Sequence, residues 1–179
     1  MKKELKYILE VALLFLIILI SLNTFVSATD YYISSGIGSD SFSGTTPSTP
    51  WKTISKVQTS LNSKLIKAGD TVHLQKESTF SITELKFIDG GSLSDGYITI
   101  RGDDYGSGTK PVLNVVGGLN GIYIQKGSYI NLHNFIIDGN NRGIYSGVMV
   151  GGGEILGSIS NIKITNLTIR NMGNSAGSY

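Results

Sequence analysis

Most of the chain after residue 70 alternates apolar and polar residues with the period of a β-strand. Residues 71–75 (TVHLQ) alternate in this way, and shorter runs recur at residues 98–100, 130–132 and 162–164. Alternating side chains point to opposite faces of a strand, so each run predicts a short strand with one buried face. Glycine, serine and asparagine separate the runs and favour tight turns. We therefore expect many short strands and few helices.

The three shorter runs recur at a constant interval, which is the same from Ile98 to Ile130 as from Ile130 to Ile162. Residues 129–138 and 161–170 share the pattern x-Ile-x-(Leu/Ile)-x-Asn-(Phe/Leu)-x-Ile-x, and one step further back reaches residues 97–101. Self-similarity of this length, with no helix between the strands, predicts a β-solenoid in which the strands of successive coils stack. The apolar side chains would then form two inward columns, Ile98-Ile130-Ile162 and Ile100-Leu132-Ile164. A sandwich of hairpins is the alternative, and it predicts no fixed register.

Two asparagines, Asn134 and Asn166, occupy equivalent corners between strands in successive repeats. Asparagine tolerates left-handed backbone geometry, and its side-chain amide can bond to the next coil. We predict that the two residues form an asparagine ladder. Asn166 also begins an Asn-Leu-Thr glycosylation sequence, but the ladder is the stronger interpretation.

A helical period begins after residue 49. Apolar residues recur at helical spacing at positions 51, 54, 57, 61 and 65, with Thr49 as the N-cap and Pro50 at the first helical position. A short strand at residues 31–34 and a loop rich in glycine, serine and threonine at residues 35–49 precede it. The sequence predicts no other amphipathic helix.

Residues 1–28 have the pattern of a secretory signal peptide. Three lysines precede a wholly apolar stretch at residues 11–20, and residues 26–28 (VSA) give the small-x-small pattern of a signal-peptidase site. We expect cleavage after Ala28 and a protein that is secreted or displayed at the cell surface. The alternative is an uncleaved membrane anchor, but the apolar stretch is shorter than the ~20 residues that a span requires.

Composition then narrows the classes of function. The chain has no cysteine, which excludes disulfides, cysteine-based metal sites and a cysteine nucleophile. It has only 4 alanines, which argues against a helical bundle. Lysine plus arginine (15) nearly balance aspartate plus glutamate (13), and no basic cluster is present, so we expect no nucleic-acid partner.

Several segments after residue 28 carry a family resemblance. They are residues 31–34, 38–40, 43–45, 49–54 and 68–72, followed by the coils rich in isoleucine and asparagine. With them the chain resembles secreted proteins of the pectate-lyase-like superfamily. The resemblance implies an all-β fold, a right-handed single-stranded parallel β-helix with an N-terminal capping α-helix. Residues 29–75 would supply the first strands, the loop and the capping helix, and residues 76–179 the coils.

The same resemblance implies a polysaccharide as the partner, bound along the face formed by the first strand of each coil. That face and an adjoining loop contain the candidate substrate-binding residues, Tyr123, Gln125, Asp138, Arg142 and Tyr145. If the protein is catalytic, the resemblance implies β-elimination from a uronate-containing polymer. The residues show no evident cofactor or metal site, and calcium is implied by the resemblance alone, because no cluster of three or four carboxylates is present. The sequence identifies no catalytic residue.

Two pairs of polar residues are interpreted as structural. Asp103 and Asp104 could form a calcium loop, but a solvated turn is the simpler interpretation, because no acidic residues follow at alternate positions. His73 and His133 lie in strand-like segments with no acidic or nucleophilic residue nearby in the sequence, and we expect them to be structural or surface groups.

No capping segment follows the last repeat, so we expect the β-helix to be incomplete, with any catalytic residues on later coils. Two functions stay open. The chain is either the N-terminal part of an extracellular, lyase-like enzyme or a noncatalytic, adhesin-type β-helix that binds glycans or displays loops. In either case we expect a monomer when full length, with membrane contact only through an uncleaved signal segment.

Overall fold

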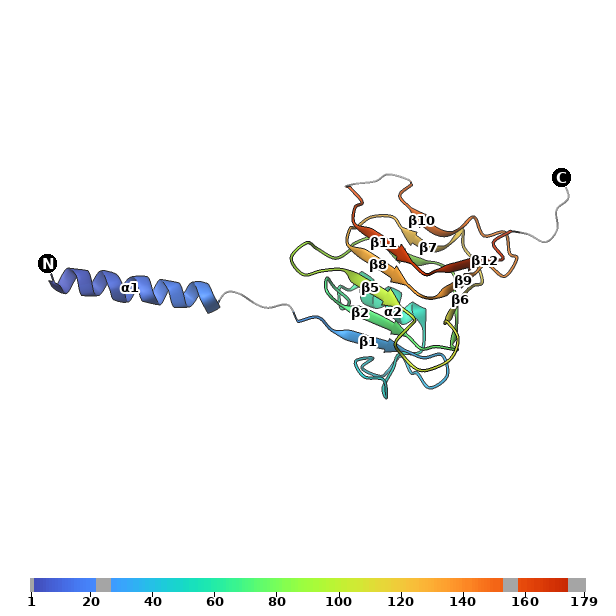
Figure 1. Cartoon of the computed structure of the whole chain (residues 1–179), viewed down its shortest axis with the longest axis horizontal. Helices are drawn as coiled ribbons and strands as arrows, with labels where there is room; N and C mark the ends of the chain where they lie inside the picture. Colours follow the sequence, from blue (N-terminus) through green and yellow to red (C-terminus); the bar gives the residue numbers. More distant parts are fainter. Residues whose placement is uncertain (1, 22–26, 153–157, 174–179) are drawn as a thin grey trace.

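The computed structural model describes residues 2–21, 27–152 and 158–173 (Figure 1). The helices are α1 (Lys2–Ser21) and α2 (Ile54–Asn62). The strands are β1 (Asp30–Ile33), β2 (Thr71–Leu74), β3 (Thr79–Ile82), β4 (Leu85–Phe87), β5 (Ile98–Arg101), β6 (Val112–Val115), β7 (Asn120–Ile124), β8 (Ile130–His133), β9 (Ile136–Asp138), β10 (Ser146–Val150), β11 (Ile162–Thr165) and β12 (Thr168–Arg170). Among the residues described, no helix is both long and apolar enough to cross a membrane.

The strands form three parallel sheets. Sheet A has the order β1-β2-β5-β8-β11, sheet B the order β12-β9-β6-β3, and sheet C the order β10-β7-β4. From β2 onward the chain passes through sheets A, B and C in turn, and every strand-to-strand pairing in them is parallel. The prediction of a mostly β protein is confirmed, and the hairpin sandwich is excluded for the strands described.

Sheet A confirms the two predicted columns. Ile98 pairs with Ile130, which pairs with Ile162, and the second column runs from Ile100 through Leu132 to Ile164. The members on β5 and β8 are buried, with exposures of 0 to 3%. The two on β11 are not, and Ile164 is 42% exposed. Burial of a column position therefore depends on having a neighbouring strand on both sides.

The step between stacked strands is constant only in part of the fold. In sheet A, the stacked residues His133 and Thr165 are 32 residues apart in the sequence. In sheet C, the stacked residues Asn120 and Ser146 are only 26 residues apart. The strands keep their register because the loops at the corners take up the differences in length.

The predicted asparagine ladder is present at the corner between sheets A and B. Asn134 and Asn166 both have left-handed backbone conformations, with φ of 60° and 54°. The side-chain amide of Asn166 donates to Oδ1 of Asn134, and Nδ2 of Asn134 donates to the carbonyl oxygen of Gly102 at 3.1 Å. Glycine is required at position 102, because a Cβ there would overlap Pro111 and the carbonyl oxygen of Asn134.

The predicted limits of the capping helix were wrong at both ends. Thr53 is the N-cap, in place of Thr49, and its Oγ1 accepts a hydrogen bond from the amide of Lys56 at 3.1 Å. Pro50 cannot begin the helix because the next residue, Trp51, is paired with β1: its amide donates to Tyr32 O at 2.8 Å. The helix ends at Asn62, so Leu65 lies beyond it and is 49% exposed.

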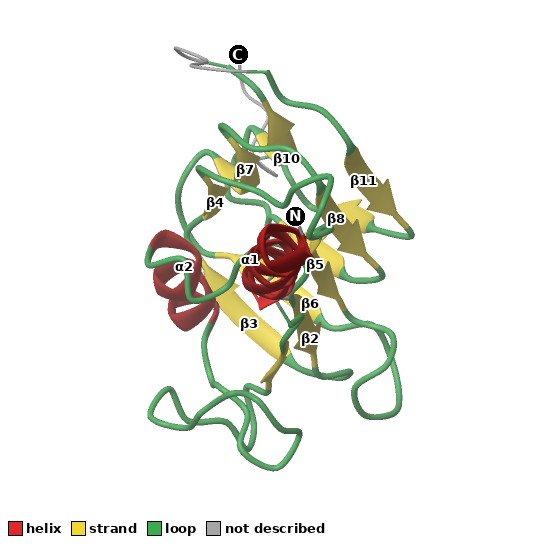
Figure 2. Cartoon of the chain, turned by 90° about the vertical axis from the view of Figure 1, so that its left-hand side faces the viewer, coloured by secondary structure: helices red, strands yellow, loops and turns green. Residues whose placement is uncertain are grey.

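Helix α2 packs beside β3 and β4, which are the first strands of sheets B and C (Figure 2). Trp51, Ile54, Val57 and Leu61 are buried in the hydrophobic core. The side chain of Gln58 makes the hydrogen bonds to β4 that a neighbouring strand would make. Its Oε1 accepts from the Lys86 amide at 2.6 Å, and its Nε2 donates to the Lys86 carbonyl at 2.9 Å. The backbone edge of β4 is thus satisfied by a side chain.

Candidate functional site

The five candidate substrate-binding residues are distributed over two sheets and one loop. Tyr123 lies on β7 and Gln125 directly follows it, both at sheet C. Asp138 ends β9 in sheet B, and Arg142 and Tyr145 lie in the loop that leads from β9 to β10. Asp138, Arg142 and Tyr145 therefore lie at the corner between sheets B and C, whereas Gln125 lies at the other end of β7, where the chain leaves sheet C for sheet A.

Tyr123 is held by contacts within the chain. It lies between Lys86 and Met149 in the register of sheet C, and its hydroxyl donates to the carbonyl oxygen of Gly152 at 2.7 Å. The Nζ of Lys86 lies 5.4 Å from the centroid of the tyrosine ring, in the range of a cation–π contact. Gln125 is half-buried beside this group. A ligand that stacked on this ring would have to displace the lysine.

Asp138 is likewise engaged. Its Oδ2 accepts from Arg170 Nε at 2.7 Å, and its Oδ1 accepts from the Asn140 amide at 2.9 Å and from Asn171 Nδ2 at 3.0 Å. Burial raises the pKa of this carboxyl, but the three hydrogen bonds outweigh burial and hold the pKa below its usual value. Asp138 therefore stays an anion at neutral pH and secures the corner.

Tyr145 is largely exposed to solvent. It is 76% exposed, and the neighbouring Leu119 is 70% exposed. The two residues are fixed side by side because the Tyr145 amide donates to Leu119 O at 2.7 Å. Arg142, in the same loop, is also exposed. This corner thus presents an aromatic ring, an aliphatic side chain and a guanidinium to solvent.

Sequence reasoning missed a polar column on the outer side of sheet A. Five residues stand in register on adjacent strands, namely Tyr32, His73, Arg101, His133 and Thr165. His133 and Thr165 are 32 residues apart, and Arg101 precedes His133 by the same interval. The repeat itself was therefore the signal that could have placed these three together.

His73 is the most buried member of this column, with 8% exposure. Its Nε2 lies 2.9 Å from Asp30 Oδ1, its Nδ1 lies 2.8 Å from Asp104 Oδ1, and its ring stacks on Tyr32 at 4.8 Å between centroids. His73 thus has two acidic neighbours in the fold, although none lies near it in the sequence, and these contacts fit the predicted structural role. Its partners lie 43 and 31 residues away in the sequence, so only the parallel register brings them to the ring.

Arg101 occupies the centre of the column and pairs with the following turn. Its Nε and a terminal nitrogen contact Asp103 at 2.7 and 2.8 Å, and Nε also lies 3.1 Å from Asp104. The hydrogen bonds from Arg101 lower the pKa of the Asp103 carboxyl to about 2, and His133, at 3.2 Å from Asp103, adds to this effect. The predicted turn is present, with Asp104 exposed and Asp103 half-buried, and the ion pairs of both carboxylates with Arg101 were not foreseen.

Neither the corner at Tyr145 nor the polar column resembles a metal centre. In the ranges that the structure covers, no three histidine, aspartate or glutamate side chains converge in a way that could hold a metal ion. The aspartate carboxylates that flank the polar column pair with Arg101 and the two histidines. The polar column therefore serves as an electrostatic tie between β1, the central strands of sheet A and the turn after β5.

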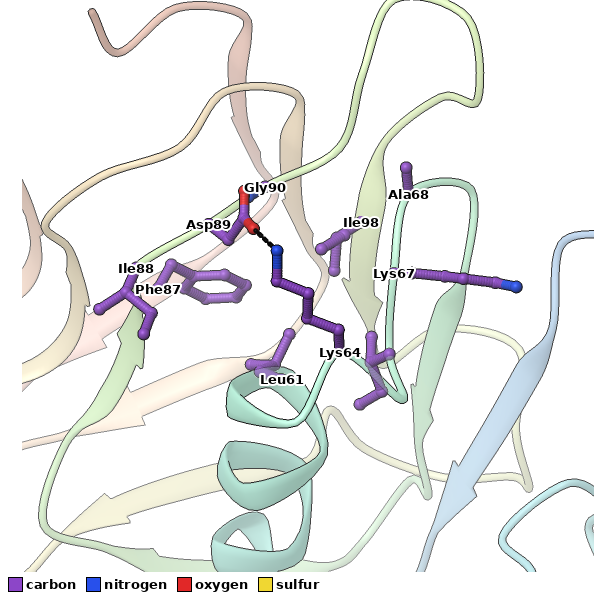
Figure 3. A pocket seen from close by; sticks show the side chains of 10 residues that line it. Leu61, Lys64, Lys67, Ala68, Phe87, Ile88, Asp89, Gly90 and Ile98 are labelled. Atoms are coloured by element: carbon purple, nitrogen blue, oxygen red, sulfur yellow. Dashed lines mark hydrogen bonds and ion pairs between the residues drawn. The ribbon is translucent and has the colours of Figure 1, made fainter. Parts of the chain in front are cut away.

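The cavity drawn in Figure 3 lies elsewhere, between the C-terminal end of α2 and the segment after β4. Its volume is about 70 Å³, room for about two water molecules. Leu61, Phe87 and Ile98 form much of its wall, and Lys64 pairs with Asp89 at 3.2 Å across it (Figure 3). It is too small for a sugar ring and is therefore not a candidate for a glycan site.

Comparison with known proteins points to enzymes that act on glycans. No protein-family model matches the chain. The chain is 30% identical over 145 residues to a lacto-N-biosidase of Bifidobacterium longum subsp. longum, an alignment that covers 81% of this chain but 8% of that protein. Crystal structures of the GH136 lacto-N-biosidase from Eubacterium ramulus, native and selenomethionine-labelled, match with a TM-score of 0.61 and 20% identity, over 82% of this chain and 28% of theirs.

The assignment to the pectate-lyase-like superfamily was therefore wrong. Both the sequence similarity and the structural similarity are to lacto-N-biosidases, which are glycoside hydrolases, and neither supports β-elimination. The segments behind that assignment form the first strand, the turn residues and the capping helix. These segments close the end of the sheets. Their sequence therefore indicates the fold and not the reaction.

Proposed function

We propose that this chain is the N-terminal part of an extracellular glycan-acting protein whose reaction is the hydrolysis of a glycosidic bond. The observation that carries the proposal is the 30% identity to a lacto-N-biosidase across 81% of the chain. We propose further that the three sheets are the faces of a right-handed parallel β-helix. Its support is the unbroken order A, B, C in which successive strands are placed, together with the parallel pairing.

The described residues are proposed to supply scaffold and ligand surface, with the hydrolytic groups on later coils. Glycoside hydrolysis uses two carboxyl groups, one of them kept protonated by a raised pKa. Four carboxyl groups have clearly shifted pKa values among the residues described, those of Asp40, Asp89, Asp103 and Asp138, and all four shifts are downward. A carboxyl group with a lowered pKa is ionised at neutral pH and is therefore a poor proton donor. The exposed apolar side chains of β11 and β12 support the continuation of the coils, because a following coil would bury them.

The ligand surface is proposed to be the corner formed by Tyr145, Leu119 and Arg142. Flat aromatic rings pack against the C–H faces of sugars, and an exposed guanidinium can donate to hydroxyl oxygens. The exposure of Tyr145 leaves its ring available for such a contact. Asp138 supports this corner, because its carboxylate accepts from the Asn140 amide in the same loop.

Glycan binding by the purified chain tests this proposal. We expect the chain to bind glycans that end in lacto-N-biose without cleaving them, as measured by calorimetry and by mass spectrometry of the products. Tyr145→Ala should weaken binding at least tenfold. Leu93→Ala removes a side chain that is 85% exposed in a different loop and should leave binding unchanged. Failure to bind lacto-N-biose glycans and every member of a wider glycan panel would count against a glycan-acting role.

Residues 1–28 are proposed to be an export signal that is removed after Ala28. Helix α1 supports this proposal, because its described side chains at residues 3–15 are all exposed and make no part of the buried core. Secretion of the precursor and the mass of the mature protein would test it. A mature chain that begins at Thr29 is expected.

A further inference from the structure

The carboxylate of Asp70 is buried but has no cation beside it among the residues described. Asp70 is 0% exposed and lies in the turn before β2. Its Oδ2 accepts from the Lys67 amide at 2.9 Å, and its Oδ1 accepts from the backbone nitrogen of Thr29 at 2.8 Å. Its charge also acts on Tyr31, whose pKa is raised first by burial and then by Asp70. Two neutral amides bind this buried carboxylate, and a charged donor in the same place would bind it more strongly.

Thr29 is also the first residue that the fold holds in place. Its carbonyl oxygen accepts from the Thr71 amide at 3.0 Å, so it extends the pairing of β1 with β2 by one residue. Ser27 and Ala28, just before it, are exposed. The boundary between exposed chain and paired chain thus falls at the bond that the signal-peptidase pattern selects.

We propose that removal of the signal peptide after Ala28 converts the Thr29 nitrogen into an ammonium group that forms an ion pair with buried Asp70. The inference rests on the proposed export signal. Water hydrolyses the Ala28–Thr29 peptide bond, Ala28 leaves with the new carboxylate, and the Thr29 nitrogen becomes an amine that takes up a proton at neutral pH. The nitrogen already lies at hydrogen-bonding distance from Asp70 Oδ1, so no rearrangement is needed.

This ion pair would couple processing to stability. In the precursor, Thr29 donates a neutral amide hydrogen bond, whereas in the mature protein it donates a charge-assisted one to the same carboxylate, which is stronger. The mature fold therefore gains stability only when the cut falls after Ala28. An α-amine that gains an anionic partner holds its proton more tightly in the folded state. The gain is thus full at a pH below about 8, the usual value for a free α-amine, and is lost at higher pH.

Comparison of two secreted forms of the protein tests the proposal. One precursor is wild type, and the other has Ser-Gly inserted between Ala28 and Thr29, so that its mature chain begins two residues earlier and Thr29 keeps an amide. Mass spectrometry establishes both N-termini. At pH 7 we expect the folding equilibrium constant, measured by urea titration, to be about tenfold larger for the wild-type mature chain. We expect this ratio to fall toward one between pH 8 and pH 10.

Two substitutions identify the partner. Asp70→Asn should abolish the ratio between the two forms, whereas Asp40→Asn should preserve it. Asp40 is the matched control, because it also accepts two backbone N–H groups, from Lys52 and Thr53, and does not contact Thr29. If Asp70→Asn does not fold, the pH profile of the two forms that keep Asp70 carries the test alone. Equal stability of the two forms at pH 7, a ratio that does not change with pH, or a mature chain that starts elsewhere would overturn the proposal, whatever the glycan-binding result.

Discussion

Replacement of equivalent isoleucines in a single column measures how burial changes along the sheets. Ile100 and Ile164 both belong to the second inward column of sheet A, with Leu132 between them. Ile100 is 1% exposed and Ile164 is 42% exposed. Each Ile→Ala change removes the same carbon atoms from a β-strand, so the loss of strand propensity is matched. The two substitutions differ mainly in how many neighbours the removed atoms have.

The expected costs follow from this difference. Complete burial of the removed carbons is worth roughly 2.4 kcal/mol at ~0.8 kcal/mol per carbon, and a residual cavity adds to it, so Ile100→Ala should destabilise the protein by about 4 kcal/mol. Ile164→Ala loses only part of this transfer energy and leaves no enclosed cavity, so about 1.5 kcal/mol is expected.

Urea unfolding of the purified chain provides the measurement, followed by the fluorescence of Trp51 and by circular dichroism. Trp51 is the only tryptophan and is 1% exposed, so its emission should change sharply on unfolding. The slope of free energy with urea should be unchanged in both variants. Costs that agree within about 0.5 kcal/mol would refute the reasoning, because they would mean that β11 is covered as fully as β5.

Three further substitutions have defined outcomes. Asn134→Ala should cost about 2 kcal/mol in urea unfolding, because it loses the ladder and strains a φ of 60°, whereas Asn134→Gly should cost less because glycine accepts that φ. Gln58→Ala should cost roughly 1–2 kcal/mol and speed hydrogen exchange at the Lys86 amide, which it leaves without a partner. Asp103→Asn should destabilise the protein at pH 7. Because the pKa of Asp103 is lower in the folded protein, its carboxylate contributes to stability above the pKa of the unfolded chain and not below that of the folded protein. The difference in stability from wild type should therefore vanish as pH falls through about 2.

Much of the fold could be predicted from local pattern because the pattern repeats. The columns through Ile98 and Ile100 and the corner asparagines follow from the alternation within each strand and from the interval that is the same from β5 to β8 as from β8 to β11. The start of α2 could not be predicted in this way. Trp51 fits the helical spacing of apolar residues, but its backbone is used to pair with Tyr32, and a single pairing across a long irregular loop leaves no periodic signal.

The candidate site was harder to predict for the same reason. The neighbours of His73 come from β1 and from the turn after β5, at separations that differ from the repeat. Asp138 was chosen for its charge, yet its carboxylate is already paired with Arg170 and Asn171 and is not free to bind a ligand. Exposure, which distinguishes Tyr145 from Tyr123, is a property of the folded molecule and cannot be read from residue type.

The unequal spacing of stacked strands has an evolutionary consequence. In sheet C the chain between Leu85 and Ile122 is longer than the chain between Ile122 and Val148, yet all three residues remain in one register. Segments can therefore be gained or lost at a corner without any change in the stacked strands. A corner such as the one that presents Tyr145 can therefore change in length and sequence while the stacked strands, and the core between them, keep the same register.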